Sequence, residues 1–184
     1  MVDGLKAAPF SSIIRSMRLI RDILREHKEA GKTAISCEFF PAKTPAGETA
    51  LLEKIVPRLK VVNPAFFSVT YGAGGGTRDK TLDIVETIQL DQNVPAMAHL
   101  TCVGSTQEDI GGFLDEASNR DICNILALRG DPPEGQEQFV KPEGGFEFSY
   151  QLVEYLYGRN ELSIGVAGFP EGHIACTEGK EIDW

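Results

Sequence analysis

The run Leu126-Ala127-Leu128-Arg129-Gly130-Asp131 decides how this chain folds, because an apolar segment ends there in a cation, a glycine and a carboxylate. A short continuous apolar run is typical of a strand buried in a parallel sheet. Charged residues directly after such a strand lie where open α/β sheets and (β/α) barrels place their ligand sites. The alternative is that Arg129 and Asp131 only cap the next turn. The recurrence of this arrangement after other segments favours a ligand site.

Apolar, strand-like runs alternate along the chain with segments of helical spacing. The runs cover 34–40, 65–71, 95–102, 122–128 and 162–168. Between them, apolar residues recur at the spacing of one helix face; they are Leu51, Leu52, Ile55 and Leu59, then Leu82, Val85 and Ile88, then Ile110, Phe113 and Leu114, and finally Leu152, Tyr155 and Leu156. This alternation predicts an α/β fold with a parallel sheet and right-handed crossovers.

The number of predicted strands falls short of a closed barrel. A (β/α)8 TIM barrel usually takes about 250 residues, whereas this chain has 184. An open sheet would leave unpaired edges, which promote association. We therefore expect an incomplete (β/α) barrel of about five βα units over residues 34–184, forming part of a longer sequence. An N-terminal helix in residues 1–33 would precede it.

Residues 11–31 have the pattern of an amphipathic helix that ends at Gly31. Its predicted apolar stripe consists of Ile13, Met17, Ile20 and Leu24. Its other face is basic. Such a face can contact a membrane or a partner, but on one helix of an acidic protein a solvated face is the stronger interpretation.

Composition argues against several classes of function. The formal net charge of -9 at pH 7 is unsuited to a nucleic-acid surface. No apolar stretch reaches the roughly 20 residues of a membrane span, and the N-terminus lacks the apolar core of a signal peptide. The four cysteines form no C-x-x-C pair and the three histidines show no metal-ligand spacing. We expect a cytoplasmic protein with reduced thiols, no metal, and neither membrane nor nucleic acid as partner.

The first predicted strand contains a carboxylate. Side-chain alternation places Ser36, Glu38 and Phe40 on one face of the strand, and Cys37 and Phe39 on the other. Burying a carboxylate in so apolar a strand is costly unless the group is paired or functional. Burial would raise the pKa of the Glu38 carboxyl toward neutrality, as a general acid requires. An ion pair to a neighbouring strand is the alternative.

The other predicted strands also end in polar or aromatic residues, namely Thr70, His99, Arg129 with Asp131, and Phe169 with His173. Glycines after Thr70 could let backbone N–H groups approach an anion. They do not form a dinucleotide fingerprint, because Thr77 stands where the last glycine is needed. A lone histidine in a strand is equally a structural residue. Together, however, these groups predict a rim that holds a flat, polar, anionic cofactor and delivers one proton.

These residues resemble the methylenetetrahydrofolate reductase family. The resemblance covers roughly residues 34–184 and rests on five motifs in order: Glu38-Phe39-Phe40-Pro41, Ser68-Val69-Thr70-Tyr71-Gly72-Ala73, His99-Leu100-Thr101-Cys102, Ala127-Leu128-Arg129-Gly130-Asp131-Pro132 and Pro170-Glu171-Gly172-His173. It implies a flavin-containing (β/α)8 barrel with FAD as cofactor. The implied reaction is reduction of 5,10-methylenetetrahydrofolate to 5-methyltetrahydrofolate, in one-carbon and methionine metabolism.

The resemblance also implies roles for individual residues. Glu38 matches the family's general acid, which promotes ring opening of the substrate, and Asp131 matches a carboxylate near flavin and folate. The matched flavin-contact positions are Thr70, His99, Arg129, Gly130, Asp131, Ser149, Phe169, His173 and Asp183. Phe169 departs from the tyrosine often found in the family, so stacking is kept while a hydroxyl contact is lost.

Members of the family continue through three more strands, one of which carries a folate-binding glutamine. A second interpretation is therefore a non-catalytic fragment or subunit that binds flavin or folate only when a partner completes the barrel. A third is a related barrel that carries folate without flavin, which the Arg129 and Asp131 pair fits less well. The sequence leaves open whether NADH, NADPH or a protein donates electrons, and whether the protein is a homo-oligomer.

Overall fold

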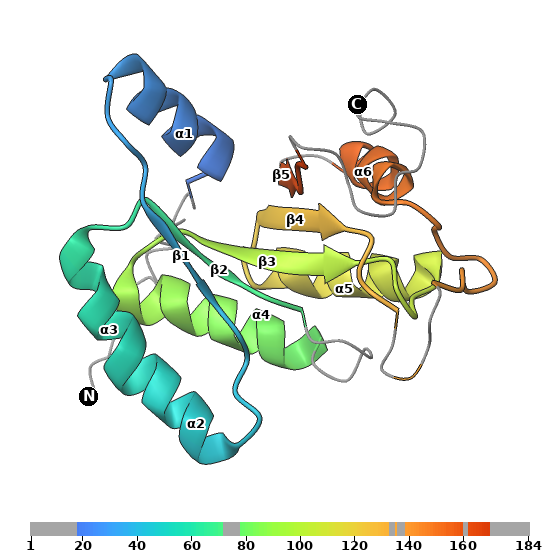
Figure 1. Ribbon diagram of the computed structural model, residues 1–184, viewed down its shortest axis with the longest axis horizontal. Coiled ribbons are helices and arrows are strands. Elements are labelled where there is room, and N and C mark those ends of the chain that lie inside the picture. Colours follow the sequence, from blue (N-terminus) through green and yellow to red (C-terminus); the bar gives the residue numbers. More distant parts are fainter. Residues whose placement is uncertain (1–17, 72–77, 133–134, 136–138, 160–161, 170–184) are drawn as a thin grey trace, which may run out of the picture.

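A computed structural model describes residues 18–71, 78–132, 135, 139–159 and 162–169 of the chain. Its sheet consists of β1 (Ser36–Phe39), β2 (Phe66–Val69), β3 (Ala96–Thr101), β4 (Asn124–Leu128) and β5 (Ser163–Val166). The strands lie side by side in sequence order, and every neighbouring pair is parallel (Figure 1). Each strand falls within one of the predicted runs, so the predicted parallel sheet is confirmed.

Helices connect the strands. They are α1 (Ile20–Glu29), α2 (Pro45–Ala50), the π-helical turn η1 (Leu51–Ile55), α3 (Val56–Leu59), the 3-10 turn η2 (Lys60–Val62), α4 (Arg78–Thr87), the π-helical turn η3 (Ile88–Gln92), α5 (Gln107–Asn119) and α6 (Ser149–Tyr157). Sequential strand order is that of a (β/α) barrel, whereas a doubly wound sheet reverses its order. Among the described residues β1 and β5 do not pair, so the barrel is not closed. None of the described helices is both long and apolar enough to cross a membrane.

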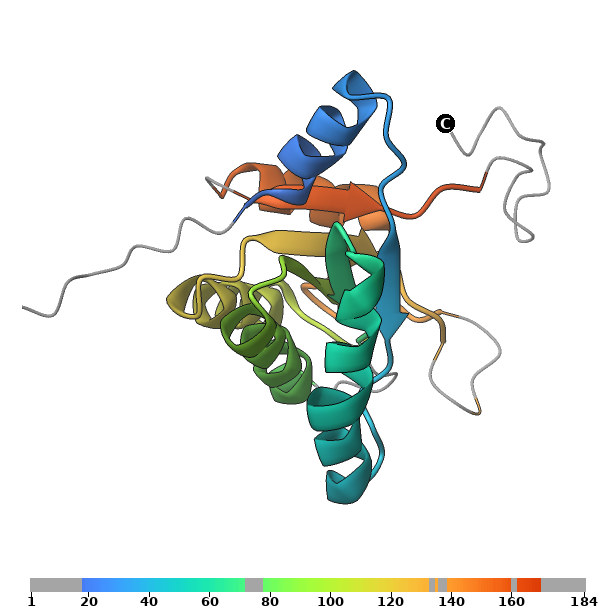
Figure 2. The ribbon, with the colours of Figure 1, turned by 90° about the vertical axis from the view of Figure 1, so that its left-hand side faces the viewer.

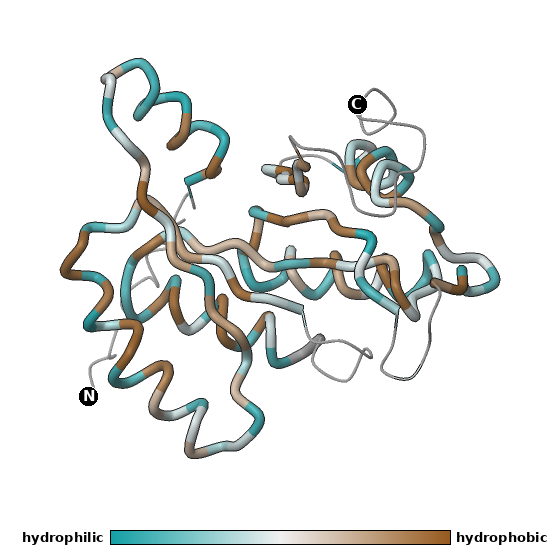
Figure 3. The backbone as a smooth tube through the Cα atoms, viewed as in Figure 1, coloured by the Kyte–Doolittle hydropathy of each residue, from teal (hydrophilic) through white to brown (hydrophobic). Residues whose placement is uncertain are grey.

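One face of the sheet is buried under the helices. Its central side chains are almost fully inaccessible and belong to one apolar cluster with residues of α4, α5 and α6; they are Phe67, Val69, Ala96, Ala98, Leu100, Ile125 and Ala127. Figure 3 shows hydrophobic colour along β4 and alternating hydrophilic and hydrophobic colour along the helices. Burying a large apolar side chain contributes about 1.5–3 kcal/mol, so this face fixes which residues point outward.

The opposite face of the sheet is the more open one. On β1 the alternation is as predicted: Phe39 is 5% exposed under the helices, whereas Phe40 is 73% exposed. The parallel register pairs Glu38 with Ser68, and Ser68 with Met97. Directly paired residues share a face. The open face therefore carries Glu38.

Helix α1 differs from the predicted segment 11–31. Its buried residues are Ile20 and Ile23, whereas Leu24 of the predicted stripe is 44% exposed. Ile13 and Met17 lie outside the described residues. The prediction for Leu24 was wrong because the side of α1 that is buried depends on how the helix docks on the sheet.

Side chains from the starts of β4 and β5 cap α1. Its own N-cap residue, Leu19, makes no side-chain cap. Instead, the Ile20 N–H donates to Asn124 Oδ1 at 2.8 Å, and the Arg21 N–H donates to Ser163 Oγ at 3.1 Å. Asn124 Nδ2 also donates to the carbonyl of Arg18 at 3.2 Å. These bonds hold α1 beside β5, at the opposite end of the molecule from α2 (Figure 2).

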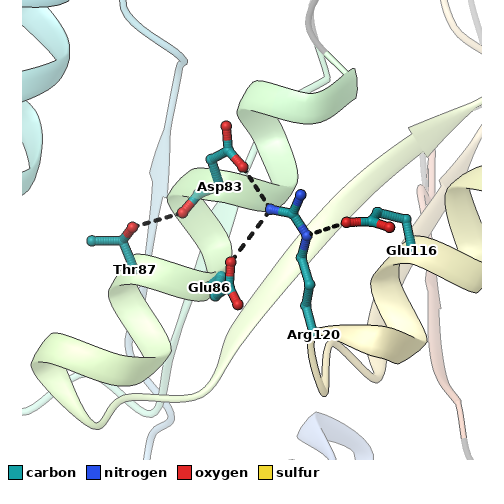
Figure 4. Close-up of polar contacts among 5 residues, drawn as sticks. All are labelled: Asp83, Glu86, Thr87, Glu116 and Arg120. Carbon is teal, nitrogen blue, oxygen red and sulfur yellow. Dashed lines mark hydrogen bonds and ion pairs between the residues drawn. The ribbon is translucent and has the colours of Figure 1, made fainter.

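Arg120 ties two helices of the outer layer together. It follows α5 and forms ion pairs with Asp83 of α4 at 2.5 Å, Glu86 of α4 at 3.3 Å and Glu116 of α5 at 2.7 Å (Figure 4). Hydrogen bonds to Asp83 and Glu116 raise the pKa of Arg120 further above its ordinary value. Because α4 and α5 are joined in this way, the helical layer under β3 is held in place.

We expect Asn124→Ala to lower the free energy of unfolding by about 1–3 kcal/mol, because it leaves the Ile20 N–H and the Arg18 carbonyl without their buried partner. Urea denaturation followed by circular dichroism measures the change. Asn119→Ala makes the same substitution at an exposed position of α5, where we expect a change within about 0.5 kcal/mol. Equal losses in the two variants would contradict the capping role.

Candidate functional site

Predicted site residues gather where the strands end. Thr70 follows β2, His99 lies near the end of β3, and Arg129 follows β4. In a parallel sheet these ends form one edge. The Thr70 N–H donates to the Phe39 carbonyl at 2.9 Å, and the Thr70 carbonyl accepts from Thr81 Oγ1 of α4 at 3.1 Å. Thr70 is thereby fixed between the sheet and the helical layer.

Glu38 and His99 meet although β2 lies between their strands. Nε2 of His99 is 3.4 Å from Oε2 of Glu38. The residue of β2 paired with Glu38 is Ser68, whose small side chain leaves room for the two longer ones. The side chain of Glu38 is 48% exposed, so the prediction that this carboxylate is buried was wrong. The reason is that β1 is an edge strand and Glu38 projects from its open face.

Burial controls the charge of His99. The residue is 5% exposed, and this burial lowers the pKa of His99, an effect that the negative charge of Glu38 partly opposes. The imidazole is therefore mainly neutral at pH 7. Its Nε2 is buried and has no hydrogen-bond partner among the described residues, so the approach to Glu38 is a close contact and not a hydrogen bond.

Two aromatic rings hold the guanidinium of Arg129. Its Cζ lies 4.5 Å from the ring centroid of Phe139 and 5.6 Å from that of Phe148. Its Nε is buried and has no hydrogen-bond partner within the described part of the chain. Stacking on aromatic rings orients a guanidinium without using its N–H donors. Arg129 is thus preorganised to donate to an anion or a polar ligand.

Gly130 makes the turn after β4 possible. Its φ of +84° is one that favours glycine, and a Cβ there would lie 2.8 Å from Val103 Cγ1 and 3.0 Å from Thr101 Cβ. The Arg129 carbonyl accepts from the N–H groups of Cys102 and Val103, each at 3.1 Å. The end of β4 is therefore packed tightly against the residues that follow β3.

For the remaining predicted site residues, the structure gives a position in the chain or an exposure. Asp131 is exposed, directly after Gly130. Ser149 is the first residue of α6, and it directly follows Phe148, whose ring contacts Arg129. Phe169 is half-exposed beyond β5. His173 and Asp183 lie outside the described residues.

Sequence reasoning missed the aromatic partners of Arg129. Phe139 belongs to an irregular segment and Phe148 directly precedes a helix, so neither stands in a periodic pattern that would have indicated its position. Thr101 is two residues after His99 in β3 and so lies on the same face of the sheet as His99.

Comparisons with known proteins agree on one family. A family model described as methylenetetrahydrofolate reductase matches residues 23–184. The chain is 42% identical over 167 residues to "Methylenetetrahydrofolate reductase (NADH) 1" of Zea mays, and 44% identical over 160 residues to the Arabidopsis thaliana protein of the same name. It is 38% identical over 143 residues to "5,10-methylenetetrahydrofolate reductase" of Escherichia coli.

These alignments cover 89%, 85% and 78% of the chain, but 28%, 27% and 46% of the respective relatives. The chain thus spans between about a quarter and a half of the length of these relatives. Among solved structures, Streptococcus suis SuiB aligns with 92% of this chain and 49% of its own, at 12% identity and a TM-score of 0.43. That likeness is too low to bear on the fold or the function.

We expect Gly130→Ala to lower the free energy of unfolding by about 1–3 kcal/mol, because alanine is strained at positive φ and its methyl group would press on Val103. Gly112→Ala is the matched control, since Gly112 lies in α5 and a Cβ there meets nothing within 4 Å. This control should raise stability by about 0.5–1 kcal/mol. Urea denaturation measures the free energy of unfolding of both variants. An unchanged value in Gly130→Ala would mean that the turn relaxes to accept the methyl group.

Glu38→Gln should lower the pKa of His99 further, because it removes the negative charge that partly opposes the effect of burial. An NMR titration of the imidazole C–H resonances, assigned with His99→Gln, measures this pKa. Glu154→Gln on the exposed side of α6 should leave it unchanged. A His99 pKa that stays the same in Glu38→Gln would show that the two side chains do not approach each other in solution.

Proposed function

The chain belongs to the methylenetetrahydrofolate reductase family, and we propose that it forms the flavin-binding part of a (β/α)8 barrel that reduces 5,10-methylenetetrahydrofolate to 5-methyltetrahydrofolate. FAD is the proposed cofactor. The observation that carries the proposal is a pair of buried polar atoms at the rim, His99 Nε2 and Arg129 Nε, which have no hydrogen-bond partner among the described residues.

The groups at the rim fit a flavin nucleotide. An unpaired buried polar atom costs about 1–3 kcal/mol, and a bound polar ligand removes that cost. Arg129 suits the negative charge of a phosphate, because a guanidinium pairs with phosphate oxygens through several donors. His99, neutral and buried, suits an uncharged polar edge of the cofactor. The residues present therefore support a ligand that is both polar and anionic.

Glu38 is the proposed general acid. FAD, when bound in its reduced form, supplies the hydride for the methylene carbon of the substrate. Glu38 projects from the open face of β1 and is half-exposed, so its carboxyl is accessible to a substrate lying over the sheet. Its carboxyl oxygen lies 3.4 Å from Nε2 of His99, and burial lowers the pKa of that imidazole, so the neighbour of Glu38 at this contact is mainly the neutral ring. The proposed role of Glu38 is to donate the proton that the substrate takes up.

The other predicted residues complete the proposed site. Asp131 places a carboxylate at the exposed end of the turn after β4, where it would influence both flavin and folate. Thr70, Gly130, Ser149 and Phe169 would line the cofactor, and His173 and Asp183 are assigned to it by resemblance alone.

We extend the proposal to the reductant, the pathway and the compartment. The maize and Arabidopsis relatives carry NADH in their names, which supports a nicotinamide as the source of electrons. The proposed product, 5-methyltetrahydrofolate, would enter methionine synthesis. The proposed compartment is the cytoplasm.

A second candidate function is that of a barrel fragment or subunit that binds flavin only after a partner completes the sheet. Exposed apolar residues lie at both edges of the sheet: Ile35 directly precedes β1, and Val166 is in β5. Unpaired strand edges with exposed apolar side chains are suited to pairing with further strands. In that case the site would become competent only in the completed barrel.

The visible absorption spectrum of the purified 184-residue chain, recorded before and after addition of FAD and desalting, distinguishes the two candidates. We expect the chain to retain flavin absorption, since the buried groups that support binding all lie within it. A chain that stays colourless would contradict independent flavin binding and favour the second candidate.

In a complete barrel that contains these residues, Glu38→Gln should bind FAD normally but reduce methylenetetrahydrofolate about 10²–10⁴-fold more slowly, because an amide does not donate the required proton. Stopped-flow oxidation of the reduced flavin by the substrate measures this step. Glu154→Gln serves as the control and should react at the rate of the unmodified protein. Full turnover by Glu38→Gln would remove Glu38 from the role of acid.

A further inference from the structure

We propose that Thr101 is a further contact residue of the flavin site and that its hydroxyl hydrogen-bonds the bound flavin. This role rests on the flavin binding proposed above. Thr101 is the last residue of β3 and is 6% exposed. Its Oγ1 is buried and has no hydrogen-bond partner among the described residues. A hydroxyl can donate and accept, and a buried one left unpaired destabilises the fold.

The position of Thr101 in the sheet directs its side chain toward the proposed site. Thr101 is two residues after His99 in the same strand, and the register pairs it with Leu128 at the end of β4. By alternation its side chain lies on the face that carries His99. The Cys102 N–H donates to the carbonyls of Leu128 and Arg129, each at 3.1 Å, which fixes the strand end where Thr101 lies.

Gly130 brings the turn after β4 directly against Thr101. A Cβ at position 130 would lie 3.0 Å from the Cβ of Thr101, so the backbone of Gly130 packs on this residue. Thr101 is therefore a neighbour of the Arg129-Gly130-Asp131 turn as well as of His99. A ligand bound to both of these groups would therefore lie next to Thr101.

The unpaired atoms are concentrated at this place. Within the described residues, buried side-chain atoms without a hydrogen bond occur at Gln89, which has other interactions, and at His99, Thr101 and Arg129. The last three stand at the ends of the adjacent strands β3 and β4. Such a concentration is expected where a polar ligand supplies the missing partners. A structural water bonded to Thr101 is the competing explanation.

Titration of the chain with FAD, followed by flavin fluorescence, tests this role in Thr101→Val and Thr101→Ser. Valine has a similar volume but no hydroxyl, so we expect it to weaken FAD binding about tenfold. Serine keeps the hydroxyl and should bind within about twofold of the unmodified chain. Thr87→Val is the matched control, since the Thr87 hydroxyl donates to the Asp83 carbonyl at 2.8 Å within the helical layer; its FAD affinity should not change.

Urea denaturation without FAD separates a ligand contact from a structural one. Thr101→Val should unfold at an equal or higher urea concentration, because it removes an unpaired hydroxyl. Unchanged FAD affinity in Thr101→Val, or a loss of affinity accompanied by a lower unfolding midpoint without FAD, would overturn the role of Thr101 alone. Failure of the unmodified, folded chain to bind FAD would instead overturn flavin binding by this chain, and the Thr101 contact with it.

Discussion

Every second residue of the three central strands β2, β3 and β4 is buried on a face that the helices cover, and this constraint determines where the residues between them can lie. Phe67, Leu100 and Ile125 are fully buried on that face, so a shift of register by one residue would expose them and bury their polar neighbours. The polar groups of the site thus owe their placement to the apolar residues between them. Because Ala98 and Leu100 are buried under the helices, the side chain of His99 between them faces the open side of the sheet.

The electrostatics of the site follow from unequal burial on the open face. His99, on a central strand, is enclosed and stays neutral, whereas Glu38, on the edge strand, remains in contact with solvent. The small side chain of Ser68 between them allows a contact across a whole strand. The contact therefore joins an accessible carboxyl group to a buried, mainly neutral imidazole, and not two buried charges.

The sequence predicted those features that depend on local patterns. The strands and the polar residues at their ends followed from short apolar runs, which are similar in any parallel sheet. The features it did not predict depend on distant parts of the chain. Burial of Ile23 in place of Leu24 is set by how α1 docks, and exposure of Glu38 is set by its being on an edge strand. The aromatic rings around Arg129 come from irregular segments whose positions no periodicity encodes.

The capping of α1 by side chains of β4 and β5 has a consequence for the order of folding. The helix is separated by 104 residues from the Asn124 side chain that binds Ile20, and by 142 residues from the Ser163 side chain that binds Arg21. Contacts over such separations form late, because the loop they close loses much entropy. During synthesis α1 emerges before the strands that cap it. Until β4 and β5 have formed, the first turn of α1 therefore lacks these hydrogen bonds.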